Sequence, residues 1–276
     1  MQWSERVSRI RLLIPAHLQT EVDAPPPERK LGVDSTKLTL NTVKKPEEGI
    51  SARFGHALRL IDDPAHEKWL YSHERASGKM VLLVVFAIGL MYLLAKLIPN
   101  IWYRMTLSNL ILCAVILPSL AMDWRQLLTP RVKYLVIGGI AAVVLYLLAW
   151  IGFLFLAGLF PSLKAQLAVL YVWRDGLSPV IAIPLLVIVI VPGEEIIWRG
   201  GITLPLAGRL GAWVGCLAGA LIFSAAYITI GSILLAITGF VTGCVWSVLL
   251  IKTRSLVPSI ICHLLWDLIV LFWLPY

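Results

Sequence analysis

Apolar residues dominate the chain from residue 80 onward, where they form seven stretches separated by short polar connections. The stretches cover 80–98, 105–122, 134–160, 178–198, 211–229, 232–251 and 256–274. Each is close to the roughly 20 residues that an α-helix needs to cross a hydrocarbon core about 30 Å thick. The pattern therefore predicts an all-α fold, a polytopic bundle of about seven transmembrane helices.

The first 79 residues have a different character and carry 13 of the 24 Lys and Arg and 11 of the 16 Asp and Glu. Residues 1–48 lack apolar periodicity, which predicts a disordered tail because such a segment buries too little surface to offset its ordering entropy. Short helices along the membrane surface are expected at 52–61 and 65–75. The sequence thus divides into a polar, partly disordered tail at 1–79 and a transmembrane domain at 80–276.

The overall composition points to a bilayer environment, with 59% hydrophobic residues, a mean hydropathy of +0.83 and a net charge of +8. Outside the tail the positive charge falls in connecting loops, which favours lipid headgroups over nucleic acid as partners. One set of loops carries more of it, at Arg125, Arg131, Lys133, Arg209, Lys252 and Arg254. The positive-inside rule therefore predicts an integral protein of the plasma membrane, or of a bacterial inner membrane, with a cytosolic N-terminus.

Several ionisable residues lie inside the apolar stretches at helical spacing. Glu195 and Arg199 are four residues apart and can pair on one helix face, while Glu194 points about 100° away from them. His263 and Asp267 are also four apart and share a face. Because ionised groups in a membrane normally face the bundle interior or water, these residues are candidates for function.

Counting residues gives the depth of these groups. At 1.5 Å per residue, Glu194 is placed roughly 9 Å from the cytosolic face and His263 roughly 10 Å from it, so the two are expected to meet. Pro192 is expected to loosen the backbone before Glu194, and Gly200-Gly201 to break the helix after Arg199. A carboxylate beside a histidine is suited to taking a proton from water and returning it to a leaving amine. Glu194 is the expected base, and Glu195 with Arg199 a structural clamp.

The two motifs resemble those of the CPBP intramembrane proteases, also called the Abi family, which includes CAAX prenyl endopeptidases and bacteriocin-processing proteins. Glu194-Glu195-Ile-Ile-Trp-Arg199 is similar to the EExxxR motif of that family, and His263-Leu-Leu-Trp-Asp267 to its HxxxN or HxxxD motif. The resemblance covers 178–274, the CPBP-like catalytic core. It implies an endopeptidase in which Glu194 activates water, His263 and Asp267 stabilise the oxyanion, and the substrate is a peptide or membrane protein.

The second family motif, FxxxH, is matched only by Phe223-Ser-Ala-Ala-Tyr227, with tyrosine at the histidine position. One histidine in the membrane domain disfavours zinc, which generally takes three protein ligands at catalytic sites, so no cofactor is expected. A phenol with a pKa near 10 is a poor proton shuttle, which predicts slow turnover. Counting from Gly211 also places Tyr227 about 24 Å deep, too far to reach Glu194.

Two alternatives to an endopeptidase remain at this point. A relative without catalytic activity would bind a peptide in the same cavity, as in bacteriocin immunity, and Tyr227 favours it. A proton-coupled transporter would also place carboxylates and a histidine in the membrane, although no inverted repeat is visible in the sequence.

Overall fold

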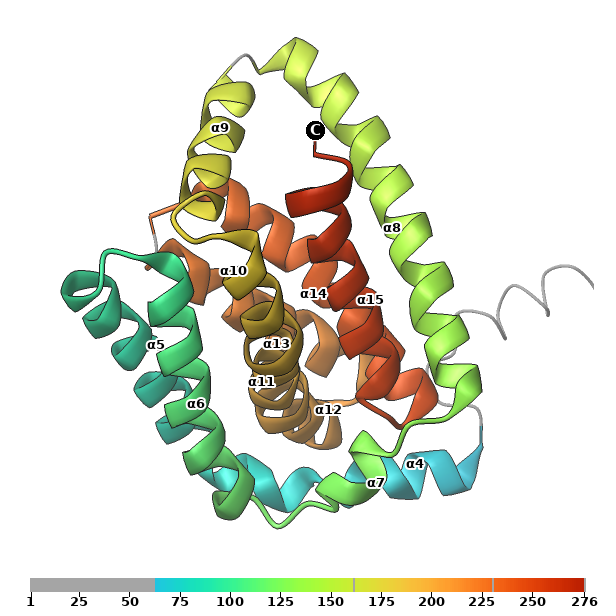
Figure 1. The fold of residues 1–276 in the computed structure, drawn as a ribbon. Coiled ribbons are helices and arrows are strands. Elements are labelled where there is room, and N and C mark those ends of the chain that lie inside the picture. Colours follow the sequence, from blue (N-terminus) through green and yellow to red (C-terminus); the bar gives the residue numbers. More distant parts are fainter. Residues whose placement is uncertain (1–62, 161, 230, 276) are drawn as a thin grey trace, which may run out of the picture. The chain divides into compact units, whose positions relative to one another are not determined.

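In the computed structural model, residues 63–160, 162–229 and 231–275 are described, and all of them belong to one compact unit, Glu48–Tyr276. The predicted disordered tail and the predicted helix at 52–61 lie outside these residues. Throughout the described part of the chain the regular structure is helical, without strands. The prediction of an all-α polytopic bundle is therefore confirmed (Figure 1).

The chain enters the bundle through helices whose first residues are fixed by side-chain caps. Asp63 accepts the backbone N–H of His66 at 2.7 Å and starts α4 (Pro64–Tyr71), which is followed by η2 (Glu74–Lys79) and α5 (Met80–Leu97). Asn100 caps α6 (Ile101–Ser119) and Asp123 caps α7 (Trp124–Leu128) in the same way. Because these short polar side chains satisfy the first free N–H groups, α6 begins four residues before the apolar stretch that predicted it.

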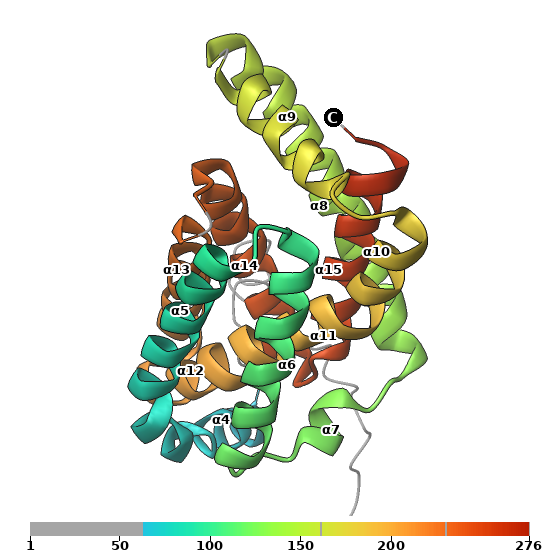
Figure 2. The ribbon, with the colours of Figure 1, turned by 60° about the vertical axis from the view of Figure 1, so that its left-hand side comes forward.

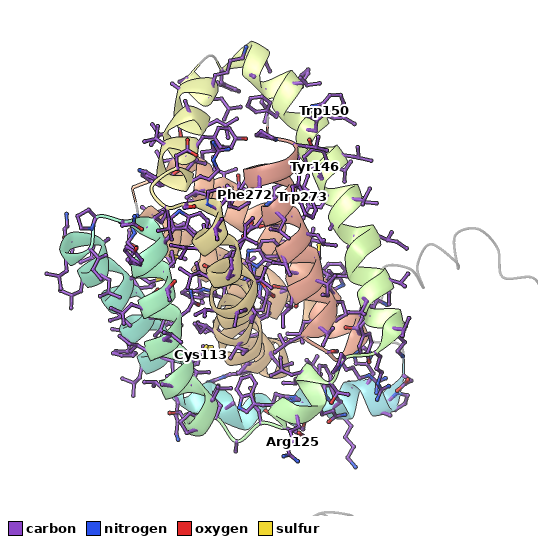
Figure 3. The ribbon with its side chains drawn as sticks, in the orientation of Figure 1. Cys113, Arg125, Tyr146, Trp150, Phe272 and Trp273 are labelled. Carbon is purple, nitrogen blue, oxygen red and sulfur yellow. The ribbon has the colours of Figure 1, made fainter. Side chains whose placement is uncertain are left out.

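The hairpin of α8 (Val132–Leu159) and α9 (Ser162–Arg174) extends beyond the neighbouring helices at the end opposite α4 and α7 (Figure 2). Most large side chains on the outer face of α8 are exposed, including Trp150, as expected for a lipid-facing surface. Close to the C-terminal residues, Tyr146 donates to the carbonyl of Leu274 at 3.0 Å, and Figure 3 shows Tyr146 near Phe272 and Trp273.

A continuous helical rod of 32 residues, Pro179–Leu210, runs through the middle of the bundle. It consists of α10 (Pro179–Leu185), η3 (Leu186–Ile190), α11 (Val191–Glu194), η4 (Glu195–Thr203) and α12 (Leu204–Leu210). The segments η3 and η4 are π-helical and lie on either side of Pro192, where the i→i−4 hydrogen bonding is already disrupted.

The break expected at Gly200-Gly201 is wrong, because these glycines serve close packing. A Cβ on Gly200 would lie 2.7 Å from the Trp124 ring, and a Cβ on Gly201 would lie 3.1 Å from Ile116. The rod therefore passes directly against α6 and α7 and continues to Leu210, twelve residues beyond the predicted end of that stretch.

Three helices complete the fold: α13 (Ala212–Ile228), α14 (Ile233–Thr253) and α15 (Val257–Leu268), which continues as the π-helical η5 (Ile269–Trp273). Gly211, at φ +88°, makes the turn from α12 into α13. A Cβ on Gly215 would overlap the backbone of Ala207 in α12, and a Cβ on Gly219 would overlap Thr203 of η4, so α13 packs directly against the rod, as the small-residue spacing indicates. Among the residues that the structure describes, five helices are long and apolar enough to span a membrane, and α13 and α15–η5 are shorter apolar helices.

Candidate functional site

The two glutamates lie near the centre of the rod and are both buried. Glu194 ends α11 with 3% of its surface exposed, and Glu195 begins η4 with none. Glu194 is 16 residues from Leu210, which places it roughly 24 Å from that end of the rod at 1.5 Å per residue. The depth of roughly 9 Å expected from the sequence assumed a helix that fits a 30 Å core, whereas the rod is longer than such a core requires.

Tyr227 reaches Glu194, contrary to the expectation from its depth. Its hydroxyl donates to Glu194 Oε1 at 2.8 Å. The count from the sequence placed the two residues at different levels because it ended the fourth stretch at residue 198, whereas the rod continues to Leu210. Glu194 stands 17 positions before the tight turn at Gly211 and Tyr227 stands 16 positions after it, so they meet at nearly one level.

His263 joins the three carboxyl groups of the site. Its Nδ1 lies 2.8 Å from Glu195 Oε1, while Nε2 lies 3.6 Å from Glu194 Oε2 and 3.5 Å from Asp267 Oδ2. An ionised carboxylate accepts hydrogen bonds only, so Nδ1 is the donor to Glu195 and Nε2 faces the other two acids. Glu195 thus contacts His263 as well as Arg199, a contact that helical spacing alone did not predict.

Arg199 sits in an aromatic enclosure next to Glu195. Its Nη1 is 3.4 Å from Glu195 Oε1, and its guanidinium carbon lies 4.1 Å from the Phe223 ring centre and 4.7 Å from that of Trp246. A Cβ on Gly243 would come within 3.1 Å of Arg199 Nη2, so this glycine makes room for the cation. Because the side chain is only 1% exposed, ion pairing and two cation–π contacts replace its hydration.

Trp246, on α14, is a site residue that the sequence analysis missed. Its ring stacks on His263 with centroids 3.7 Å apart and planes 17° from parallel. The other tryptophans near predicted helix ends resemble a membrane-interface belt, whereas Trp246 lies inside a stretch and three residues after Gly243. That position, one turn from a glycine that admits a cation, is the signal that could have identified it.

Charge balance limits what this cluster does chemically. Glu194, Glu195 and Asp267 face one permanent cation, Arg199, and one histidine. Full ionisation of all three acids would leave net negative charge in a water-poor interior, which favours keeping a proton within the cluster. Asp267, whose side chain is 22% exposed, is the most accessible acid of the group. The arrangement can accept and donate protons within one small volume.

The side chains of the site are sparse in metal-binding groups other than carboxylates. Within residues 63–275, apart from 161 and 230, no group of three or more His, Cys, Asp or Glu side chains has an arrangement suited to a metal ion. His263, the sole imidazole in the site, already uses Nδ1 for Glu195. The donor set therefore does not fit the catalytic zinc centres built from several histidines.

Comparison with known proteins bears on the same part of the chain. The model of one family, described as "Type II CAAX prenyl endopeptidase Rce1-like", matches residues 176–269, which contain every residue of the site. This segment is similar to that family. The resemblance to the CPBP and CAAX proteases predicted from the two motifs is thereby confirmed, whereas the replacement of a family histidine by Tyr227 stays a prediction. Neither a curated protein nor a solved structure matches the chain.

The Rce1-like segment belongs to a membrane-spanning protein. Its helices α10–α12 and α14 are among the five long apolar helices of the bundle, and α13 and α15 pack between them. The family match and the long apolar helices together indicate an integral membrane protein.

Proposed function

We propose that the protein is an intramembrane endopeptidase of the CAAX-protease type, in which Glu194 activates water for attack on a peptide bond. The observation that carries the proposal is that the two carboxylate oxygens of Glu194 have different partners. Oε1 accepts the Tyr227 hydroxyl at 2.8 Å, whereas Oε2 lies 3.6 Å from His263 Nε2, beyond a direct hydrogen bond. Oε2 is therefore the oxygen left to take a proton.

The proposed reaction uses the side chains around that oxygen. Glu194 Oε2 takes a proton as the water oxygen bonds to the carbonyl carbon, and the carbonyl electron pair moves onto its oxygen. His263, protonated on both nitrogens, donates from Nε2 to that oxyanion and from Nδ1 to Glu195, with Asp267 beside Nε2. The C–N bond then breaks as Glu194 returns its proton to the leaving amine.

The surrounding residues keep these groups in place. Glu195 holds His263 through Nδ1, Trp246 fixes the plane of the ring, and Arg199 compensates the charge of Glu195. Tyr227 orients Glu194 and takes no proton, since a phenol remains protonated at neutral pH. The basic loops favour a cytosolic N-terminus, and the site lies in the interior of the bundle.

The test is cleavage by purified protein in lipid vesicles, with prenylated and unprenylated CAAX peptides as substrates and mass spectrometry as the readout. Glu194→Gln and His263→Ala should each lower turnover by at least about 100-fold, the usual contribution of one acid–base group. Glu67→Gln, the same change on the exposed face of α4, is the matched control. Equal cleavage by all four proteins would sink the assignment.

The proposal includes catalysis without a metal, because one histidine and three carboxylates already paired with one another are poor zinc ligands. Prolonged treatment with EDTA and with 1,10-phenanthroline should therefore leave turnover unchanged. Loss of activity in chelator, restored by adding zinc, would contradict this part of the mechanism and leave the dependence on Glu194 standing.

A relative that binds peptides without cleaving them is the second candidate, and Tyr227 is the observation that favours it. The phenol hydrogen-bonds the base where the resemblance expects a histidine. Tyr227→His would then convert an inactive protein into an active one, with a gain of about 100-fold or more over background. Under the endopeptidase proposal the native protein already cleaves, and Glu194→Gln removes that activity.

A further inference from the structure

A polar cleft is lined by residues at the end of α4 and the start of α7, two helices that lie at one end of the bundle (Figure 1). It has a volume of about 260 Å³ and is walled on one side by Trp69, Ser72 and His73, and on the other by Asp123 and Gln126. The spans α5 and α8 begin, and α6 ends, at this same end of the molecule. A bilayer spanned by these helices would place the cleft near its boundary with water.

On the α4 side of the cleft, the N–H and O–H donors of Ser72 and His73 are already engaged in hydrogen bonds within the protein. Ser72 Oγ donates to the carbonyl of Trp69 at 2.6 Å, and His73 Nδ1 lies 2.8 Å from the same oxygen. A carbonyl oxygen only accepts, so the proton of His73 is on Nδ1 and Nε2 keeps a lone pair. Burial lowers the pKa of His73 below its ordinary value, which keeps the ring neutral at pH 7. Ser72 and His73 therefore offer acceptors to a ligand.

The α7 side adds negative charge. Asp123 Oδ1 accepts the backbone N–H of Gln126 at 3.0 Å as the cap of α7, and the exposed carboxylate keeps further acceptor capacity. Arg125, the nearest cation along the helix, extends away from the bundle (Figure 3). The half-buried indole of Trp69 adds an aromatic surface that attracts cations.

We propose that this cleft binds a primary alkylammonium group. Such a group carries three N–H donors and one positive charge, which complement the acceptors of Ser72, His73 and Asp123 and the ring of Trp69. Two sources share this chemistry: the headgroup of an ethanolamine phospholipid and a small soluble amine. The inference is independent of the proposed protease activity, because no residue of the cleft belongs to the site around Glu194.

The test measures ligand retention on the full-length protein in detergent by native mass spectrometry. The probes are phosphatidylethanolamine, phosphatidylcholine with matched acyl chains, and free ethanolamine with choline as its partner. Quaternary ammonium groups have no N–H donors, so the ethanolamine compounds should bind about tenfold more tightly than the choline compounds. Asp123→Asn should lower that affinity about tenfold, since its amide can still cap α7 but carries no charge.

Asp63→Asn is the matched control, because Asp63 caps α4 at the same end of the molecule but does not line the cleft. His73→Phe, which removes the Nε2 acceptor, should also weaken retention. Selective retention of the phospholipid alone supports a lipid headgroup, and binding of free ethanolamine as well supports a general amine site. Equal retention of ethanolamine and choline compounds, or equal losses in Asp123→Asn and Asp63→Asn, would overturn the proposal.

Discussion

At the scale of single residues, the site depends on how one imidazole ring is held. His263 is fixed along its edge by Glu195 and across its face by Trp246, so both the direction of Nε2 and the plane of the ring are set. With the Glu195 contact alone, the imidazole ring could still rotate about the axis of the Nδ1 hydrogen bond. Stacking removes that freedom, which is why a residue outside the motifs belongs to the site.

Replacing Trp246 should therefore affect turnover more than binding. In the proposed reaction Trp246→Ala should lower kcat about 100-fold with little change in KM, since a displacement of about 1 Å can have an effect of that size. Trp246→Phe keeps a stacking ring and should recover most of the loss. Trp266→Ala is the control, because Trp266 is also buried, with 6% exposed, but is not stacked on His263. If the two alanine variants lose Tm and kcat in parallel, Trp246 is merely a core residue.

At the scale of helices, the close approach of α13 to α12 holds Tyr227 at the level of Glu194. A Cβ on Gly215 would meet the backbone of Ala207, which cannot move aside as a flexible side chain can. Gly215→Ala should therefore lower the free energy of unfolding by about 1–3 kcal/mol, as for other overpacked sites. The measurement is denaturant unfolding in detergent.

Gly89→Ala provides the comparison for this effect. Gly89 lies in the middle of α5 with no atom within 4 Å of an added Cβ, so alanine should stabilise the helix by about 0.5–1 kcal/mol. Equal effects of the two substitutions would show that helix propensity, and not contact with Ala207, governs the response at Gly215.

Hydrophobic pattern predicted the helices well because a membrane requires long apolar segments, and each of the seven stretches corresponds to a helix or rod. The pattern failed at glycines, because glycine can either break a helix or allow close packing against it. Gly200-Gly201 suggested a broken helix, but these residues admit Trp124 and Ile116. Apart from Pro192, nothing in the sequence indicated the π-helical segments of the rod. Their i→i+5 hydrogen bonds depend on how the neighbouring helices pack around the rod. Helical spacing indicated the Glu195–Arg199 and His263–Asp267 pairs, whereas the Glu195–His263 contact required the fold.

At the scale of the whole molecule, the distribution of basic residues gives the bundle a direction. The end with α4 and α7 carries Arg125, Arg131, Lys133, Arg209, Lys252 and Arg254. The opposite end, beside α9 and the C-terminal turn, carries Lys96, Arg104, Lys164 and Arg174. Arg104 is buried, and Arg174 donates to Asp175 and to the carbonyl of Leu271. The exposed, unpaired positive charge is therefore even lower at this end than the number of basic residues indicates.

This asymmetry predicts that the α4–α7 end faces the cytosol, and single cysteines can test it. Thr129→Cys in the α7–α8 connection and Ser178→Cys before α10 both place a thiol at an exposed position, at opposite ends of the molecule. In intact cells a membrane-impermeant maleimide should label Ser178→Cys at once and Thr129→Cys only after permeabilisation, because the positive-inside rule retains basic loops in the cytosol. The unsubstituted protein measures background from its four native cysteines, which are buried or half-buried. The reverse labelling order would place the α4–α7 end, with the acceptor-rich cleft, outside the cell.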